Sequence, residues 1–176
     1  TLTKSSLLCL RASAHRNGDA LLAIAKEFDL QRICLTDEDA RHEAANKLPN
    51  GLKLLGGTEG LDELASTETA DVVLVAVVGT AGLSPTLAAL SSGKDVALAN
   101  KEALVTGGKF VVETAEANGA CILPTDSEHN AVFQCLGGGP AKQVEKIILT
   151  ASGGPFLDWS SDRMAKVSPE EALQHP

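Results

Sequence analysis

Val72-Val73-Leu74-Val75-Ala76-Val77-Val78 is the strongest strand signal in the chain. The run is continuously apolar rather than alternating, which is typical of a strand buried on both faces in a parallel sheet. It has the length of a buried strand and falls far short of a membrane span. We therefore expect it to lie inside a parallel sheet with both of its faces covered.

Strand-like and helix-like segments alternate on both sides of this run, up to Gly119. The periodicity predicts further strands at residues 7–12, 32–35, 52–55, 96–98 and 121–123. It predicts helices at residues 18–28, 37–48, 58–65, 84–90 and 109–118. In the first helix, the side chains expected to face inward are Leu21, Leu22, Ile24 and Ala25; Thr36 and Ser84 are the expected N-caps of the second and fourth. Such alternation implies right-handed βαβ crossovers and a doubly wound parallel, Rossmann-like α/β sheet.

The regular alternation of strand-like and helix-like segments ends after Cys121, where a different structural layer is expected to begin. A Gly-Gly-Gly-Pro turn at 137–140, a strand at 144–150 and a helix opened by Ser168 follow. We place a boundary between residues 1–122 and 123–176. The second part is the start of an α+β domain, because one strand and one or two helices cannot close a core.

The composition limits the partners of this protein. The 176 residues carry a net charge of −8, which argues against a nucleic acid or an anionic membrane held by bulk charge. There is no signal-peptide pattern. The four cysteines lack the CxxC spacing of metal or redox sites, so we interpret Cys9, Cys34, Cys121 and Cys135 as reduced core residues of a cytosol-like compartment.

A dense polar cluster, Thr125-Asp126-Ser127-Glu128-His129-Asn130, follows the short strand that ends at Leu123. Ligands bind outside the carboxyl ends of strands in α/β sheets, and a pair of carboxylates there suits Mg²⁺ or Mn²⁺. The same residues can simply open a helix, with Thr125 or Asp126 as its cap and Glu128 at the positive end of the dipole. Taken alone, the cluster is more typical of a helix cap than of a metal site.

Two loops are candidates for contact with a cofactor. Ser13-Ala14-His15-Arg16-Asn17 follows the first strand and contains Arg without an acid, which favours the 2′-phosphate of NADP over the 2′-hydroxyl of NAD. Val78-Gly79-Thr80-Ala81-Gly82 follows the central strand, and its glycines permit close backbone approach. Either loop could equally be an ordinary βα turn.

Two further segments could hold a substrate. Asn100-Lys101-Glu102 lies at the carboxyl end of a strand, where the lysine could bind an oxygen while the glutamate balances its charge. Ser152-Gly153-Gly154 could form an anion-binding nest, and a phosphate there could also recruit His175. The alternatives are a solvated surface pair and a plain turn.

In combination, these segments resemble the 1-deoxy-D-xylulose 5-phosphate reductoisomerases. The resemblance rests on Ala-Asn-Lys-Glu-Ala-Leu-Val at 99–105, Asp-Ser-Glu-His-Asn at 126–130 and Ser-Gly-Gly-Pro-Phe at 152–156, together with the segments at 12–17 and 78–88. It runs in order through essentially the whole chain. It implies an NADPH-dependent oxidoreductase of non-mevalonate isoprenoid biosynthesis that needs Mg²⁺ or Mn²⁺.

The resemblance also implies a role for individual residues. Asp126 and Glu128 match metal ligands, and Lys101, Asp126 and Glu128 would be the catalytic set. The substrate-binding positions are Lys101, Ser127, Glu128, Ser152 and His175, the last two near the substrate phosphate. The cofactor positions are His15, Arg16, Asn17, Asn100 and Glu102. Residues 1–122 would then be the NADPH-binding domain, and residues 123–176 the beginning of the catalytic domain.

The family's pattern includes parts that this sequence lacks. They are the glycine-rich pyrophosphate loop with its βα unit, the lid, a further Ser, Asn and Lys for the phosphate, and a third metal-binding Glu. The resemblance therefore implies an internal fragment that is inactive alone. It further implies a homodimeric parent enzyme located in a bacterial cytoplasm or a plastid stroma.

Two other functions remain open from the sequence. One is a different NADP-dependent two-domain oxidoreductase, which would not need Asp126 and Glu128 as a metal pair. The other is a non-catalytic nucleotide-binding module.

Overall fold

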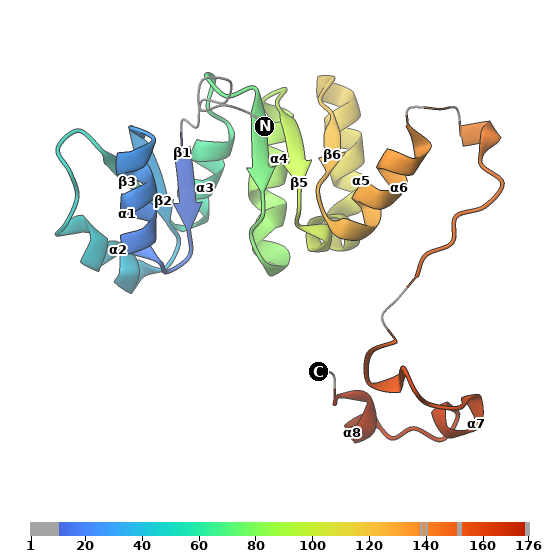
Figure 1. Cartoon of the computed structure of the whole chain (residues 1–176). Coiled ribbons are helices and arrows are strands. Elements are labelled where there is room, and N and C mark those ends of the chain that lie inside the picture. The colour runs from blue at the N-terminus through green and yellow to red at the C-terminus, as the bar shows by residue number, and fades with distance from the viewer. Residues whose placement is uncertain (1–10, 138, 140, 151–152, 175–176) are drawn as a thin grey trace. The chain divides into compact units, whose positions relative to one another are not determined.

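Short parallel strands with helices between them build the first part of the protein (Figure 1). The computed structural model describes residues 11–137, 139, 141–150 and 153–174. The chain divides into two compact units, Thr1–Ala131 and Val132–Pro176. No helix in the described residues is long and apolar enough to cross a membrane.

In the described residues of the first unit, the strands form two three-stranded parallel sheets. The first sheet has the order β1-β2-β3, made of β1 (Arg11–Ala14), β2 (Arg32–Leu35) and β3 (Lys53–Gly56). The second has the order β4-β5-β6, made of β4 (Val72–Val75), β5 (Asp95–Leu98) and β6 (Ile122–Pro124). Because every pairing is parallel, the carboxyl ends of the three strands in each sheet share one edge.

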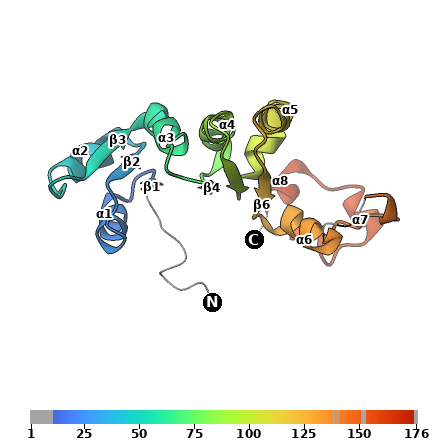
Figure 2. The same ribbon diagram turned by 90° about the horizontal axis from the view of Figure 1, so that it is seen from above.

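Helices connect successive strands, as the sequence predicts for an α/β fold. In chain order they are α1 (Gly18–Glu27), α2 (Glu38–Ala45), α3 (Gly57–Ala65), the 3-10 turn η1 (Gly79–Gly82), α4 (Leu83–Ser91), α5 (Lys101–Asn118) and α6 (Ser127–Leu136). α3, α4 and α5 pack side by side in a row (Figure 2). α1 contacts α2. The parallel α/β, Rossmann-like class is thus confirmed.

The helix ends follow elementary capping chemistry. Asn17 accepts a hydrogen bond from the backbone N–H of Ala20 and begins α1, and Gly119 ends α5 in the left-handed conformation at φ 65°. Strand and helix positions agree with the predictions to within a few residues, except that α5 begins at Lys101 rather than at residue 109. α5 continues through the glycine pair at 107–108 with a kink at Gly107. The predicted strand residues 7–10 lie outside the described residues.

Two predicted N-caps are wrong. Asp37, not Thr36, caps α2, because its carboxylate accepts from the N–H of Ala40 at 3.0 Å. Ser84 lies inside α4, which continues directly from η1, and its hydroxyl donates to Asp62 on α3.

Burial corrects the central expectation about the run at 72–78. Val75 is 3% exposed and belongs to the core with α4 and α5, whereas Val72 and Leu74 are 51% and 66% exposed. The strand alternates in burial because α3, α4 and α5 lie in one row, and no helix in the described chain covers the face that carries Val72 and Leu74. In α1, Ile24 is likewise exposed, whereas Leu21 and Ala25 are buried and Leu22 packs partly on the core.

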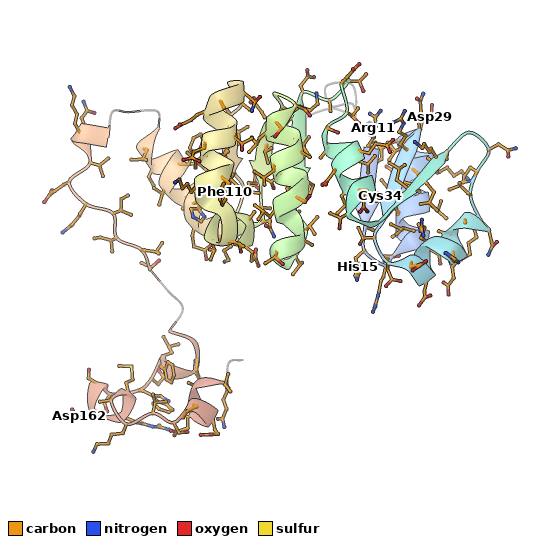
Figure 3. The ribbon with its side chains drawn as sticks, turned by 180° about the vertical axis from the view of Figure 1, so that it is seen from behind. Arg11, His15, Asp29, Cys34, Phe110 and Asp162 are labelled. Atoms are coloured by element: carbon orange, nitrogen blue, oxygen red, sulfur yellow. The ribbon has the colours of Figure 1, made fainter. Side chains whose placement is uncertain are left out.

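The cysteines are free where the structure describes them, but only one is in the core. Cys34 lies between the first sheet and α3, in a cluster with Leu55 and Leu61 (Figure 3). Burial raises the pKa of its thiol to about 11, which keeps it protonated and unreactive. Cys121 and Cys135 are exposed, so their assignment to the core is wrong, and Cys9 lies outside the described residues.

The second unit has little regular structure. It contains η2 (Ala141–Gln143), η3 (Gly154–Phe156), α7 (Ser161–Met164) and α8 (Pro169–Ala172), the last opened by Ser168 in a full capping box. Trp159 packs edge-to-face on Phe156 and lies under the guanidinium of Arg163. The predicted strand at 144–150 is wrong in this structure, since these residues are irregular and none of them is buried.

Candidate active site

The carboxyl ends of β5 and β6 bring two of the three family motifs together, those at 99–105 and 126–130. Leu98 pairs with Pro124 across the sheet, and the N–H of Thr125 donates to the carbonyl of Leu98 at 3.0 Å. Lys101 follows β5 and Glu128 follows β6, so their side chains meet at this edge. The Lys101 Nζ lies 3.8 Å from a carboxylate oxygen of Glu128.

Asp126 sits at the start of α6 and is already engaged. Its Oδ1 accepts from the backbone N–H of His129 at 2.9 Å, and both carboxylate oxygens lie 2.8 Å from His129 Nδ1. Its side chain is 10% exposed. Burial alone would raise the pKa of Asp126, but the hydrogen bonds from His129 outweigh it and lower the pKa below its ordinary value. The carboxylate is therefore ionised at neutral pH.

Glu128 is the more open carboxylate of the pair. The Ser127 hydroxyl, a backbone N–H and the charge of Lys101 together lower its pKa below the ordinary value. Ser127 Oγ donates to Glu128 at 2.9 Å. Two ionised carboxylates on one helix turn are suitable ligands for a hard divalent cation that completes its shell with other oxygens. Across the described ranges, no cluster of three or more His, Cys, Asp or Glu could hold a metal ion.

The edge of the first sheet presents a second polar group (Figure 3). At the carboxyl end of β1, His15 Nδ1 lies 2.8 Å from the hydroxyl of Thr36, and Arg16 Nε donates to Asp37 at 3.0 Å. The N–H of Ala40 and then Arg16 lower the pKa of Asp37. Residues 13–17 contain no acidic side chain, and Asp37 in the loop after β2 supplies the carboxylate that balances the charge of Arg16.

A small pocket of about 110 Å³ adjoins this group. Arg16 and Asn17 line it together with Lys47 and the start of α1. The Arg16 side chain is 75% exposed, so its guanidinium remains accessible to an anion despite the bond to Asp37. A larger hollow of about 710 Å³ lies over α2 and β3, between Arg41, His42 and Lys53, and contains none of the predicted site residues.

Asn100 and Glu102 are placed differently from each other. Asn100 is 1% exposed, and its carboxamide bonds to backbone groups of the loop after β4 and of α5. Glu102 is half-buried beside it. Ser152 and His175, the predicted phosphate contacts, lie outside the described residues.

A family model described as 1-deoxy-D-xylulose 5-phosphate reductoisomerase matches residues 4–108, and a model of that enzyme's C-terminal domain matches residues 122–176. The chain belongs to the 1-deoxy-D-xylulose 5-phosphate reductoisomerase family. The resemblance seen in the motifs is therefore confirmed.

Relatives in the reductoisomerase family align along nearly the whole chain. The 1-deoxy-D-xylulose 5-phosphate reductoisomerase of Desulfitobacterium hafniense (strain DSM 10664 / DCB-2) is 47% identical over 165 residues, covering 93% of this chain and 43% of that protein. The one from Protochlamydia amoebophila is 44% identical over 173 residues, covering 98% of this chain and 45% of that protein. The chain thus spans less than half the length of these relatives.

Solved reductoisomerase structures share the fold. A crystal structure of DOX-P reductoisomerase in complex with NADPH, fosmidomycin and magnesium matches with a TM-score of 0.81 and 42% identity, covering 98% of this chain and 45% of that one. The Zymomonas mobilis enzyme in complex with NADPH matches with a TM-score of 0.82 and 39% identity, again over 98% of this chain and 45% of that one.

Sequence reasoning missed several residues of these two edges. Thr36 bonds to His15, Asp37 bonds to Arg16, and His129 bonds to Asp126. The only sequence signal for these three residues was their position shortly after a predicted strand. Gly82 contacts Asn100 so closely that a Cβ atom would lie 2.7 Å from its carboxamide carbon. The glycine-containing loop at 78–82 was the available signal for that contact.

Proposed function

We propose that the full-length protein containing this chain converts 1-deoxy-D-xylulose 5-phosphate to 2-C-methyl-D-erythritol 4-phosphate, using NADPH and Mg²⁺ or Mn²⁺. Family membership supports this, and so does the meeting of Lys101 with Glu128, beside Asp126, at the carboxyl ends of β5 and β6. The relatives carry the name of this activity, and solved family structures contain NADPH and magnesium.

In this proposal the residues at the carboxyl ends of β5 and β6 hold the reacting end of the sugar phosphate. Lys101 presents its ammonium to a substrate oxygen, and Glu128 keeps that charge balanced. Asp126 and Glu128 would hold the divalent ion, with His129 orienting Asp126. Bound there, the ion would polarise the substrate carbonyl and stabilise developing negative charge during the skeletal rearrangement.

The edge of the first sheet would receive the adenosine end of NADPH, which supplies the hydride of the reduction. Arg16 is open to the 2′-phosphate, while His15 and Asn17 stand on either side of it in sequence. The positive end of α1, where Asn17 already caps Ala20, adds favourable electrostatics for an anion. Ser127, Ser152 and His175 remain the proposed further contacts to the substrate, and Asn100 and Glu102 the proposed positions near the cofactor.

We further propose that residues 1–122 form a Rossmann-like domain without its first βα unit, and that residues 123–176 begin the catalytic domain. The doubly wound order places the first strand between the two halves of the sheet. In the described chain, β1 and β4 each have a strand on one side only. Arg11 on β1 donates to the hydroxyl of Thr69, just before β4, at 3.2 Å, and α3 packs on α4. The edge strands β1 and β4 therefore belong to the same compact unit.

The activity can be tested directly. The full-length protein should oxidise NADPH in the presence of the ketose phosphate and Mn²⁺, whereas the 176-residue chain, which spans less than half the length of its relatives, should show no turnover. An inactive full-length protein would refute the proposed function, and turnover by the chain alone would refute its status as an incomplete enzyme. We also propose, from family membership, that the full-length protein is a homodimer, which analytical ultracentrifugation tests. Family membership likewise supports a location in a bacterial cytoplasm or a plastid stroma.

A single substitution tests the metal ligands. Asp126→Asn in the full-length protein should weaken Mn²⁺ binding at least about tenfold, because even the partners of metal ligands are worth about 10- to 100-fold. Asp39→Asn, an exposed carboxylate on α2, is the control. Titration by Mn²⁺ electron paramagnetic resonance gives both affinities. Equal affinities in the two variants would favour another NADP-dependent oxidoreductase.

A further inference from the structure

Asn100 is the only fully buried side chain among the predicted site residues that the structure describes. It follows β5 and directly precedes Lys101. Its Oδ1 accepts from the N–H of Ala103 at 2.9 Å, which makes it the N-cap of α5. Its Nδ2 donates to the carbonyls of Val77 and Gly79, the latter at 2.8 Å. The carboxamide therefore bridges the ends of two neighbouring strands.

The same group is packed against a glycine that cannot be enlarged. A Cβ atom on Gly82 would lie 2.7 Å from both Cγ and Oδ1 of Asn100. Gly82 has φ −76° and ψ −14°, which an alanine adopts without strain. The glycine is thus required by the neighbouring carboxamide and not by its own backbone. The hydroxyl of Thr86, a fully buried residue, donates a hydrogen bond of 2.7 Å to the carbonyl oxygen of Gly82.

These contacts engage both the oxygen and the nitrogen of the Asn100 carboxamide, and the residue is 1% exposed, so its side chain is not open to a ligand. Its Oδ1 caps α5, and the two hydrogens of its Nδ2 face two backbone carbonyls and the carboxylate of Glu102. What they fix is the first turn of α5, which carries Lys101 and Glu102. A fixed start of α5 in turn fixes the lysine that meets Glu128 of the candidate metal pair.

We propose that Asn100 and Gly82 act together as positioning residues: the buried carboxamide, seated on the glycine, joins the loop after β4 to the start of α5 and sets the place of Lys101. This inference rests on the proposed function of Lys101 in the intact enzyme. It assigns the side chain of Asn100 to the scaffold of the site rather than to contact with the cofactor.

Gly82→Ala in the full-length enzyme is the first test, because it leaves Asn100 itself unchanged. We expect kcat/KM for the ketose phosphate to fall about 10- to 100-fold, since small displacements of positioning groups have effects of that size. Gly108→Ala is the matched control, because a Cβ atom there meets nothing within 4 Å. It should leave both kinetic constants unchanged.

Asn100→Ser is the second variant and guards against a folding defect in the first. Serine keeps an N-cap oxygen for Ala103 but loses the donors to Val77 and Gly79. Its smaller side chain also makes room beside Gly82. The double variant Gly82→Ala/Asn100→Ser should therefore be no worse than Asn100→Ser alone, giving strong non-additivity in a double-mutant cycle.

The pattern of effects separates positioning from direct cofactor contact. Positioning predicts that Asn100→Ser and Gly82→Ala lower kcat/KM for the sugar phosphate by similar factors, with the dissociation constant for NADPH, read by its fluorescence, nearly unchanged. A loss confined to NADPH affinity in Asn100→Ser, with Gly82→Ala behaving like Gly108→Ala, would overturn the inference. Additive effects in the double variant would also overturn it. If the unsubstituted enzyme is inactive with this substrate, the proposed function fails. That result differs from the two outcomes above, which compare variants of an active enzyme.

Discussion

At the scale of single residues, Asp126 shows that a helix cap and a candidate metal ligand can be the same side chain. One of its oxygens accepts from the N–H of His129, as a cap does, and both contact the His129 imidazole. The sequence could not choose between the two interpretations because an acidic residue at the end of a strand suits both a helix cap and a metal ligand. The structure shows the cap directly and leaves the metal role as a proposal.

Asp37 allows a residue-scale prediction about pH. Its pKa is lowered in the folded chain by the N–H of Ala40 and by Arg16. A group whose pKa is depressed by folding stabilises the fold above its unfolded pKa, about 3.9, and loses that effect as the pH falls through the folded value. Asp37→Asn keeps a capping oxygen but removes the charge. We expect it to lower the free energy of unfolding at pH 7 and to match the unsubstituted chain at pH 2.

Urea denaturation of the 176-residue chain across this pH range provides the measurement. Glu38→Gln, which changes an exposed carboxylate one residue away, is the control and should show a smaller difference. A deficit of Asp37→Asn that persists unchanged at pH 2 would show that the carboxylate charge is not the cause. The pairing itself was hidden in the sequence, because Arg16 and Asp37 are 21 positions apart and meet only through the register of β1 with β2.

At the scale of elements, β4 shows what hydrophobicity alone can predict. The run at 72–78 does form a parallel strand, but only Val72–Val75 pair, and burial alternates along them. A continuous apolar run indicates that both faces are meant to be covered, yet it does not say by what. In the described chain, α3, α4 and α5 cover one face, which leaves Leu74 66% exposed.

Two leucine-to-alanine substitutions test this difference between the faces. Leu98→Ala, at a position 1% exposed, should destabilise the 176-residue chain by about 2–5 kcal/mol. Leu74→Ala should change its stability by no more than about 0.5 kcal/mol, as for a surface residue. In the full-length protein, where we propose that a first βα unit adjoins β4, Leu74→Ala should become clearly destabilising. Chemical denaturation of both lengths measures these values, and an equally small effect of Leu74→Ala in both would contradict the proposed unit.

At the scale of the whole chain, the two compact units differ in their cores. The first unit has buried clusters in each of its sheets, whereas no described residue of 132–174 is buried. Hydrophobic burial is the main source of folding free energy, so the second unit has little independent stability. The described residues of the second unit therefore supply no buried core of their own.

Truncation tests the contrast between the units. Removing residues 138–176 should leave the thermal midpoint of the chain within about 2 °C of its original value, because none of the described residues in the removed part is buried. Circular dichroism followed during heating gives the midpoint. A large fall, or loss of a cooperative transition, would show that residues 138–176 stabilise the first unit.

The sequence by itself determined the α/β class, the alternation of elements and the motifs that mark the family, because these depend on local periodicity and on residue type. Only the tertiary structure decided which motifs meet. Strand register places Lys101 near Glu128 and Arg16 beside Asp37, and it seats Asn100 on Gly82. These contacts join residues far apart in the chain, so they follow from the order and pairing of strands and cannot be read from local sequence. The same holds for β4: its apolar run required burial, but the arrangement of the helices decided which face received it.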